Sequence, residues 1–198
     1  QYMTDIVEIK AVYDFTAALD NKVRVWMFGN NASGLLGISK TDDIQKYPQR
    51  VLAGKSKSTT MYLENIVSIA AGAHHMLALD KNGSVWAWGD NSYSQVGNNS
   101  TADVVAVPAQ VMYEYDHENH VVVLLKVFIK ISDVKEHMNA LTRSEKNVVT
   151  WGKNLNTITS ASGIQTNKMA VELLDDLDNN SVVTDTIMIA SGDNTSAI

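Results

Sequence analysis

Two acidic segments of this 198-residue chain contain residue types that bind metal ions. The first is Asp116-His117-Glu118-Asn119-His120, in which two histidines stand beside two carboxylates. Imidazole and carboxylate groups are common zinc ligands. The spacing is not the His-Glu-x-x-His pattern of a helical zinc site, and the segment lies between repeated units. We therefore expect a solvated loop here, with a metal site as the alternative.

The second acidic segment, Asp175-Asp176-Leu177-Asp178-Asn179-Asn180, has the oxygen-rich composition of a calcium-binding loop. An EF-hand loop needs glycine at its sixth position and glutamate at its twelfth. Counted from Asp176, these positions are Ser181 and Ile187. An acidic turn is the favoured interpretation and calcium binding the alternative. Neither segment leads us to predict a metal or a cofactor.

Three histidines, His74, His75 and His137, stand at expected strand starts, where a histidine could serve as a base. No motif places a serine or a carboxylate beside them. The chain has no phosphate loop, nucleophile elbow or dinucleotide fingerprint. The absence of cysteine excludes thiolate catalysis and disulfides. We therefore predict no catalytic residue and no enzyme, with the imidazoles bonded to the backbone of neighbouring loops.

The elements that must position these side chains belong to an internal repeat. The segment Val25-Trp26-Met27-Phe28-Gly29-Asn30-Asn31 matches Val85-Trp86-Ala87-Trp88-Gly89-Asp90-Asn91 after a shift of 60 positions. A third copy is Val149-Thr150-Trp151-Gly152-Lys153-Asn154. A repeat of this length is typical of propellers and solenoids. We predict one domain, 1–198, built from repeats 6–65, 66–127, 128–186 and a partial repeat 187–198.

The recurring residues are interpreted as architectural. Repeated asparagines cap turns, and repeated glycines allow a special backbone angle or the close approach of a strand. The four tryptophans are expected to be largely buried between sheets, so that Trp86→Ala costs several kcal/mol. The predicted architectural set is Trp26, Gly29, Asn31, Gly37, Gly72, Trp86, Trp88, Gly89, Asn91, Gly97, Trp151, Gly152 and Asn154.

Each repeat has the pattern of short strands separated by turns. Asn82-Gly83 stands between two apolar runs, which is the strongest short-range signal of a β-hairpin. In the strand that follows, large rings alternate with small residues, which suits a sheet packed between neighbouring sheets. We expect further strands around 48–51 and 108–111. The predicted fold is all-β: a partial β-propeller of four-stranded antiparallel blades, about three and a half in this chain.

The run from Ile69 to Leu79, continued from Asn82 to Gly97, resembles the regulator of chromosome condensation repeat family. This resemblance implies a seven-bladed β-propeller whose loops bind another protein. Members of the family include an exchange factor for a small nuclear GTPase, plant ultraviolet receptors, a bacterial inhibitor of β-lactamase and bacterial surface proteins. No insertion resembles the wedge of the exchange factor. The sparse tryptophans do not match the paired chromophore of the receptors.

Composition narrows the choice of partners. The formal charge of -6 argues against non-specific binding to nucleic acid or anionic membranes. No apolar run is long enough to cross a bilayer, since the run at 121–125 is interrupted by Lys126. The chain begins at Gln1, which we interpret as a trimmed or processed chain. With the bacterial members of the family in view, we expect an extracellular or cell-surface bacterial protein.

The sequence thus predicts a non-catalytic protein-interaction module with an unknown protein partner. The variable loops at 38–47, 98–107, 113–120 and 155–168 are the expected binding elements. Tyr47, Tyr93 and Tyr113 are the candidate partner-binding residues, because aromatic side chains dominate interface energetics. The alternatives are a guanine nucleotide exchange factor and an enzyme inhibitor. We also expect either a homodimer that closes a seven-bladed ring by exchanging half-blades or a fragment of a longer secreted protein.

Overall fold

The computed structural model of the chain describes residues 3–41, 44–54, 61–114, 122–123, 128–134, 137–143, 147–153, 166–172, 174–176, 181–182, 190–192 and 195–197. Within these residues the regular structure is β-strand, apart from the short 3-10 helix η1 (Ala32–Gly34). None of the described segments forms a helix with the length and apolarity that crossing a bilayer needs.

Two antiparallel sheets of four strands, each connected in sequence order, account for the first half of the chain. We call them blade 1 and blade 2. Blade 1 consists of β1 (Ile6–Val12), β2 (Phe15–Asp20), β3 (Val25–Gly29) and β4 (Gln45–Arg50). Blade 2 consists of β5 (Ile66–Ala71), β6 (His75–Asp80), β7 (Val85–Asp90) and β8 (Val104–Gln110). The Asn82-Gly83 hairpin is where the sequence predicts it.

Blade 3 has the same antiparallel order with a short addition at its outer edge. Its four main strands are β11 (Phe128–Val134), β12 (His137–Thr142), β13 (Val148–Lys153) and β14 (Thr166–Glu172). Strand β9 (Tyr113–Glu114) pairs in parallel with β14, and β10 (Val122–Val123) pairs with β9. The third sheet therefore has six strands rather than the expected four, because the connection from blade 2 returns along the edge of blade 3.

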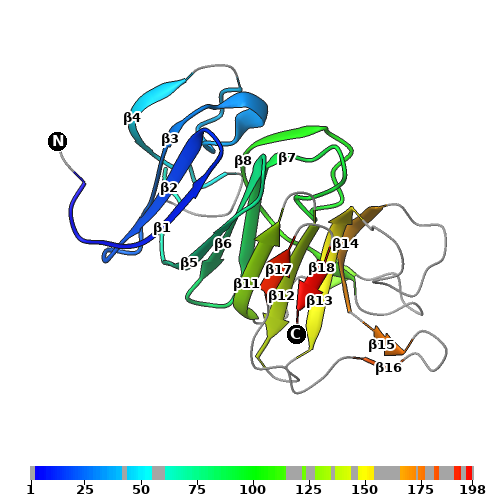
Figure 1. Cartoon of the computed structure of the whole chain (residues 1–198). Helices are drawn as coiled ribbons and strands as arrows, with labels where there is room; N and C mark the ends of the chain where they lie inside the picture. Colours follow the sequence, from blue (N-terminus) through cyan, green and yellow to red (C-terminus); the bar gives the residue numbers. More distant parts are fainter. Residues whose placement is uncertain are drawn as a thin grey trace.

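Two short hairpins complete the described part of the chain. They are β15 (Leu174–Asp176) with β16 (Ser181–Val182) and β17 (Ala190–Gly192) with β18 (Thr195–Ala197). Strand β17 lies against β11 and β12 of blade 3. Figure 1 shows the three blades side by side in chain order, with the β17–β18 pair next to blade 3. This is the all-β, partial propeller predicted from the sequence.

The blades repeat in detail as well as in outline. Each first strand contains a β-bulge at the same place, between Ile6 and Glu8, Ile66 and Ser68, and Phe128 and Lys130. Each first strand also pairs an isoleucine with an alanine of the second strand, as Ile69 does with Ala78. Pro48 and Pro108 lie in the fourth strands, at sheet edges, where a missing N–H costs no ladder hydrogen bond.

The core lies between blades rather than inside them. One buried cluster joins Ala17, Leu19 and Met27 of blade 1 to Ile69 and Trp88 of blade 2. A second cluster joins the opposite side of blade 2 to blade 3, with members that include Leu77, Ala87, Met138 and Trp151. We call the side of a blade that faces the preceding blade its upstream face, and the other side its downstream face. Because each interface is built from two blades, a single repeat has no core of its own.

Candidate protein-interaction surface

Because consecutive strands are antiparallel, the connections between them lie alternately at one end of the blade and at the other. The turns β1–β2 and β5–β6 and the loops β3–β4 and β7–β8 share one end, which we call the loop end. The turns β2–β3 and β6–β7 and the connections between blades lie at the opposite end. The loops at 38–47 and 98–107 therefore belong to the loop end, whereas the segment beginning at Tyr113 belongs to the connection between blades 2 and 3. The four predicted binding loops do not form one surface.

Exposed aromatic side chains stand at the loop end of neighbouring blades. Tyr13 in the β1–β2 turn has an exposed fraction of 78%, and Tyr47 in β4 has 77%. The ring of Tyr13 stacks on His74 of blade 2, with centroids 6.1 Å apart. Tyr93 is 36% exposed, and the Lys153 ammonium of blade 3 lies 4.2 Å from its ring centroid. The loop end thus presents flat rings that are partly held by side chains of the next blade.

Two of the three predicted tyrosines therefore lie at the loop end, and the third does not. Tyr47 and Tyr93 stand at the loop end with exposed rings. Tyr113 is in β9, on the connection between blades, and its side chain lies outside the described part of the structure. Sequence reasoning missed Tyr13, because it compared strands and long loops and passed over the two-residue β1–β2 turn.

Buried asparagines hold the loops at this end. Asn31 accepts a hydrogen bond from the backbone N–H of Leu36 at 2.9 Å and donates to the carbonyl of Lys40 at 3.0 Å. In blade 2, Asn91 accepts from the N–H of Val96 at 3.0 Å and donates to the carbonyl of Ala102 at 2.7 Å. Each amide therefore connects two separate points of its loop rather than closing one turn. The third predicted asparagine, Asn154, lies outside the described residues.

Tryptophan connects each blade to the loop of the blade before it. Trp88 Nε1 donates to the carbonyl of Leu35 in blade 1 at 2.8 Å, and Trp151 Nε1 donates to the carbonyl of Gln95 in blade 2 at 2.8 Å. Both rings are fully buried. Trp26 and Trp86 are half-buried, so they are covered less completely than Trp88 and Trp151. Their indole N–H groups face a polar turn.

The recurring glycines lie where a side chain would meet the backbone or a ring. A Cβ at Gly37 would lie 3.0 Å from Trp88 Nε1, and one at Gly97 would lie 2.7 Å from Trp151 Cδ1. Gly29, Gly89 and Gly152 have φ values of 110°, 109° and 91°. A Cβ at Gly72 would meet the buried imidazole of His75. The first pair of glycines leaves room for the ring of the following blade.

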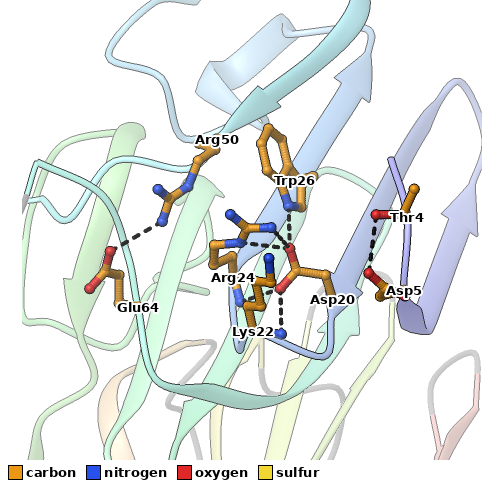
Figure 2. Close-up of polar contacts among 8 residues, drawn as sticks. All are labelled: Thr4, Asp5, Asp20, Lys22, Arg24, Trp26, Arg50 and Glu64. Carbon is orange, nitrogen blue, oxygen red and sulfur yellow. Dashed lines mark hydrogen bonds and ion pairs between the residues drawn. The ribbon is translucent and has the colours of Figure 1, made fainter. Parts of the chain in front are cut away.

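An aspartate organises the β2–β3 turn, and the sequence analysis gave it no role (Figure 2). Asp20 Oδ1 accepts from the N–H groups of Lys22 and Arg24 at 2.9 and 3.1 Å. Its Oδ2 accepts from Trp26 Nε1 at 2.9 Å and from the Arg24 guanidinium. In blade 2, Asp80 accepts from Trp86 Nε1 at 3.1 Å. The available signal was the recurrence of Ala-Leu-Asp at 18–20 and 78–80.

Two arginines cover Trp26 in blade 1. The Arg24 guanidinium carbon lies 5.3 Å from the Trp26 ring centroid, and that of Arg50 lies 5.9 Å away. Arg50 also pairs with Glu64 at 3.3 Å. Blade 2 has Ser84 and Gln110 at the corresponding positions. Each arginine forms an ion pair with a carboxylate of the same cluster. We therefore interpret the two arginines as packing that shields the half-buried Trp26 ring.

Acid titration tests the role of Asp20. Burial raises the pKa of the Asp20 carboxyl, but hydrogen bonds from Arg24 and Trp26 and the charge of Arg24 lower it by more. The carboxylate therefore stabilises the fold above the unfolded-state pKa of about 3.9, and this contribution is lost as pH falls through the lower folded-state value. We expect Asp20→Asn to cost about 1–3 kcal/mol at pH 7, with the difference from wild type closing below about pH 4.

Urea unfolding at a series of pH values measures this effect. Asp103→Asn is the matched control, because the Asp103 side chain is exposed, and it should follow the wild-type profile. A constant difference in unfolding free energy between Asp20→Asn and wild type down to strongly acidic pH would contradict the assignment.

The candidate metal and catalytic sites gain no support from the described residues. No group of three or more histidine, aspartate or glutamate side chains in the described part of the chain could hold a metal ion. The segment Asp116–His120 lies outside those residues, as do 177–180. Asp175 and Asp176 are in strand β15. His75 and His137 are buried in β6 and β12, and His74 is exposed at the loop end.

Repeated four-stranded blades with buried interfaces and exposed loop-end rings define this chain as a β-propeller segment. A model of the regulator of chromosome condensation (RCC1) repeat matches residues 24–79 and 82–124, and a second RCC1 repeat model matches 66–95. These matches span half of the chain. The chain therefore belongs to the RCC1 repeat family, as predicted from the run that begins at Ile69.

Known proteins are similar to this chain in sequence or in fold. Human Protein RCC2 is 39% identical over 90 residues, which are 46% of this chain and 16% of RCC2. Prp20p from Saccharomyces cerevisiae, described with its binding properties to Gsp1p and histones, aligns with a TM-score of 0.65 at 20% identity. That alignment covers 86% of this chain and 39% of Prp20p. Yeast RCC1 (Prp20) bound to Kap60 aligns over 97% of this chain and 41% of its own, with a TM-score of 0.67 and 18% identity.

The expected bacterial origin and extracellular or cell-surface location are wrong. The curated relatives come from eukaryotes, among them Homo sapiens, Xenopus laevis and Dictyostelium discoideum, and the aligned Prp20p structure comes from yeast. The expectation rested on family members that share the same blade packing. Blade packing constrains which residues stand in strands and turns, and these residues do not indicate where in or outside the cell the protein lies.

Proposed function

We propose that this chain is a non-catalytic protein-interaction module that binds its partner at the loop end. The exposed rings of Tyr13 and Tyr47 carry the proposal, because they stand at the end that also displays the β3–β4 and β7–β8 loops. Rigid aromatic side chains supply much contact area at a low entropic cost. In the described parts of these loops, Asn31 and Asn91 hold the backbone by hydrogen bonds, which lowers the order that these parts have to gain on binding.

The kinship with Prp20p suggests which proteins to test as partners. Prp20p binds Gsp1p, histones and Kap60. For the present chain, a protein partner fits better than a nucleic acid or a membrane, since its formal charge is -6. A basic protein such as a histone suits that charge by simple complementarity.

Binding to purified Gsp1p and to core histones tests the loop-end proposal. We expect saturable binding to one of them, weakened about tenfold or more by Tyr13→Ser or Tyr47→Ser, as for an interface hot spot. Biolayer interferometry measures the dissociation constants. Val67→Ser is the matched control, because Val67 is 49% exposed but is the second residue of β5, at the opposite end of the blade. If neither protein binds, or if the control weakens binding equally, the proposal is wrong.

Guanine nucleotide exchange is the second candidate function, favoured by the likeness to Prp20p, which is described with Gsp1p. A stopped-flow assay separates the two functions. Catalytic amounts of the chain should leave the release of fluorescent GDP from Gsp1p at its intrinsic rate if the chain is only a binding module. A dose-dependent acceleration would identify an exchange factor.

The repeat boundaries form part of the same proposal. Repeats 6–65 and 66–127 begin with β1 and β5, and repeat 128–186 begins with β11. The β17–β18 pair lies within the partial repeat 187–198. We interpret the recurring tryptophans, glycines and asparagines as the framework that holds the loop end, and the tyrosines as the groups that contact the partner.

A further inference from the structure

The β6–β7 turn of blade 2 contains the one Asn-Gly pair of the sequence, Asn82-Gly83. In such a pair the backbone nitrogen of glycine can attack the side-chain amide carbon of asparagine, because glycine has no side chain to hinder the approach. The attack forms a cyclic succinimide and releases ammonia. Water then opens the ring at either carbonyl, which gives aspartate or isoaspartate. Asparagine is among the thermolabile residues of proteins, and Asn82 is exposed to the water that the reaction consumes.

The hydrogen bonds of this turn hold the attacking nitrogen. Gly83 N–H donates to the backbone carbonyl of Asp80 at 2.9 Å. Asp80 Oδ1 accepts from the N–H groups of Asn82 and Ser84 at 2.8 and 3.0 Å. To react, Gly83 N must approach the side-chain carbon of Asn82 and lose its proton, and both steps break its bond to Asp80. The closed turn therefore opposes the reaction, which requires local opening of the turn.

The carbonyl that follows this pair connects blade 2 to blade 3. Gly83 O accepts from the N–H of Phe128, the first residue of β11, at 2.9 Å. Phe128 is buried in the core cluster between the two blades. Blade 1 is connected to blade 2 in the same way, since Val23 O accepts from Ile66 N–H at 3.1 Å. A change of the backbone at residue 82 therefore acts directly on a hydrogen bond between blades.

The β2–β3 turn of blade 1 has the same hydrogen bonds but cannot undergo this reaction. Val23 N–H donates to the carbonyl of Asp20 at 3.0 Å, and Asp20 Oδ1 accepts from the N–H of Lys22 at 2.9 Å. Lysine has no side-chain amide carbon for the next nitrogen to attack. The φ values at positions 23 and 83 are 58° and 87°, so the backbone is left-handed in both turns. The blade 1 turn is therefore an internal control for the blade 2 turn.

We propose that Asn82 is a site of spontaneous deamidation, that the closed β6–β7 turn slows the reaction, and that the isoaspartate product loosens blade 3 from blade 2. In isoaspartate the main chain runs through Cβ and Cγ, which adds one carbon atom before Gly83 N. The longer chain no longer places Gly83 N–H on the carbonyl of Asp80 or Gly83 O on Phe128 N–H. The site lies at the end of blade 2 opposite the loop end, so it is independent of the proposed partner binding.

Peptide mass spectrometry of protein incubated at mildly alkaline pH tests the site and its protection. We expect Asn82 to be the main site of ammonia loss in the urea-unfolded chain and to react about tenfold or more slowly in the folded chain. Asp80→Ala removes the carboxylate that holds the turn and should speed the reaction of the folded chain about tenfold. Asp20→Ala changes the matching turn of blade 1 and should leave the rate at Asn82 unchanged. Circular dichroism confirms that each variant is folded.

Hydrogen exchange of the purified isoaspartate form tests the consequence for the blades. The Phe128 amide should exchange about tenfold faster than in the unreacted chain, whereas the Ile66 amide between blades 1 and 2 should keep its rate. Freshly prepared Asn82→Asp adds a carboxylate without lengthening the main chain and should keep the protection of Phe128. Equal deamidation rates in the folded and unfolded chains would overturn the proposal. So would a different main site in the unfolded chain, or unchanged exchange at Phe128 in the isoaspartate form.

Discussion

Replacing Trp88 with alanine should lower the free energy of unfolding by about 3–5 kcal/mol, the usual cost of removing a packed aromatic side chain. The ring is fully buried between blades 1 and 2. Its indole N–H also satisfies the buried carbonyl of Leu35, which would be left without its donor. Since small domains are stable by about 5–15 kcal/mol, the variant should unfold at a clearly lower urea concentration than wild type, monitored by far-ultraviolet circular dichroism.

Two further substitutions separate the parts of this effect. Trp88→Phe keeps a smaller aromatic ring and removes the N–H, so we expect a smaller loss, of about 1–3 kcal/mol for the buried carbonyl left without its donor; blade 1 already has Phe28 at this position. Trp86→Ala should cost less than Trp88→Ala, because Trp86 is half-buried. An unfolding midpoint for Trp88→Ala equal to that of wild type would show that the inter-blade core does not stabilise the fold.

A methyl group at Gly97 should be nearly as damaging. Gly97 has a φ of 63°, a left-handed conformation that costs an L-residue about 1–2 kcal/mol. The added Cβ would also stand 2.7 and 2.8 Å from two atoms of the Trp151 ring. That ring is packed and bonded to the carbonyl of Gln95, so it has no free space to move into. Overpacking adds about 1–3 kcal/mol, and Gly97→Ala should destabilise the chain by about 2–5 kcal/mol.

A double-mutant cycle isolates the steric part. In a Trp151→Leu background the clash with the ring is gone, and Gly97→Ala should then cost only the backbone component of about 1–2 kcal/mol. Chemical denaturation of the four proteins gives the coupling energy. Strict additivity of the two substitutions would mean that Gly97 does not make room for the ring of the following blade.

The strands and their repetition were predictable because packing between blades imposes the same residues at the same positions each time. The segment from Val85 to Asn91 alternates large and small side chains, and the structure divides these between the two core clusters. The Asn82-Gly83 turn was equally predictable, since Gly83 has a φ of 87°. These signals are local, and a repeat presents each of them more than once.

What could not be predicted depends on partners distant in sequence. The bond from Trp88 to Leu35 joins residues 53 positions apart, and no local pattern distinguishes Trp88 from the half-buried Trp86. Asp20 and Asp80 recur in the Ala-Leu-Asp segments, but the sequence does not show that they bond to a tryptophan. Trp26 and Trp86 come close to these carboxylates only once the turn between the two strands has formed. The parallel pairing of β9 with β14, Tyr113 against Ala170, has no counterpart among the described strands of blades 1 and 2. The two ends of the blades differ only through the alternating direction of the strands, which the residue pattern of a loop does not contain.

Each buried tryptophan bonds to a loop that was synthesised before it, so the inter-blade hydrogen bonds must form in chain order during synthesis. Leu35 meets Trp88 only after 53 more residues have been added, and Gln95 meets Trp151 after 56. At a translation rate of about 5–20 residues per second, each loop therefore waits roughly 3–10 s for the ring that fixes it. Each blade therefore gains its last inter-blade hydrogen bond from the blade synthesised after it. If synthesis paused once blade 2 had left the ribosome, the carbonyl of Leu35 would already be bonded to Trp88, whereas that of Gln95 would still lack Trp151.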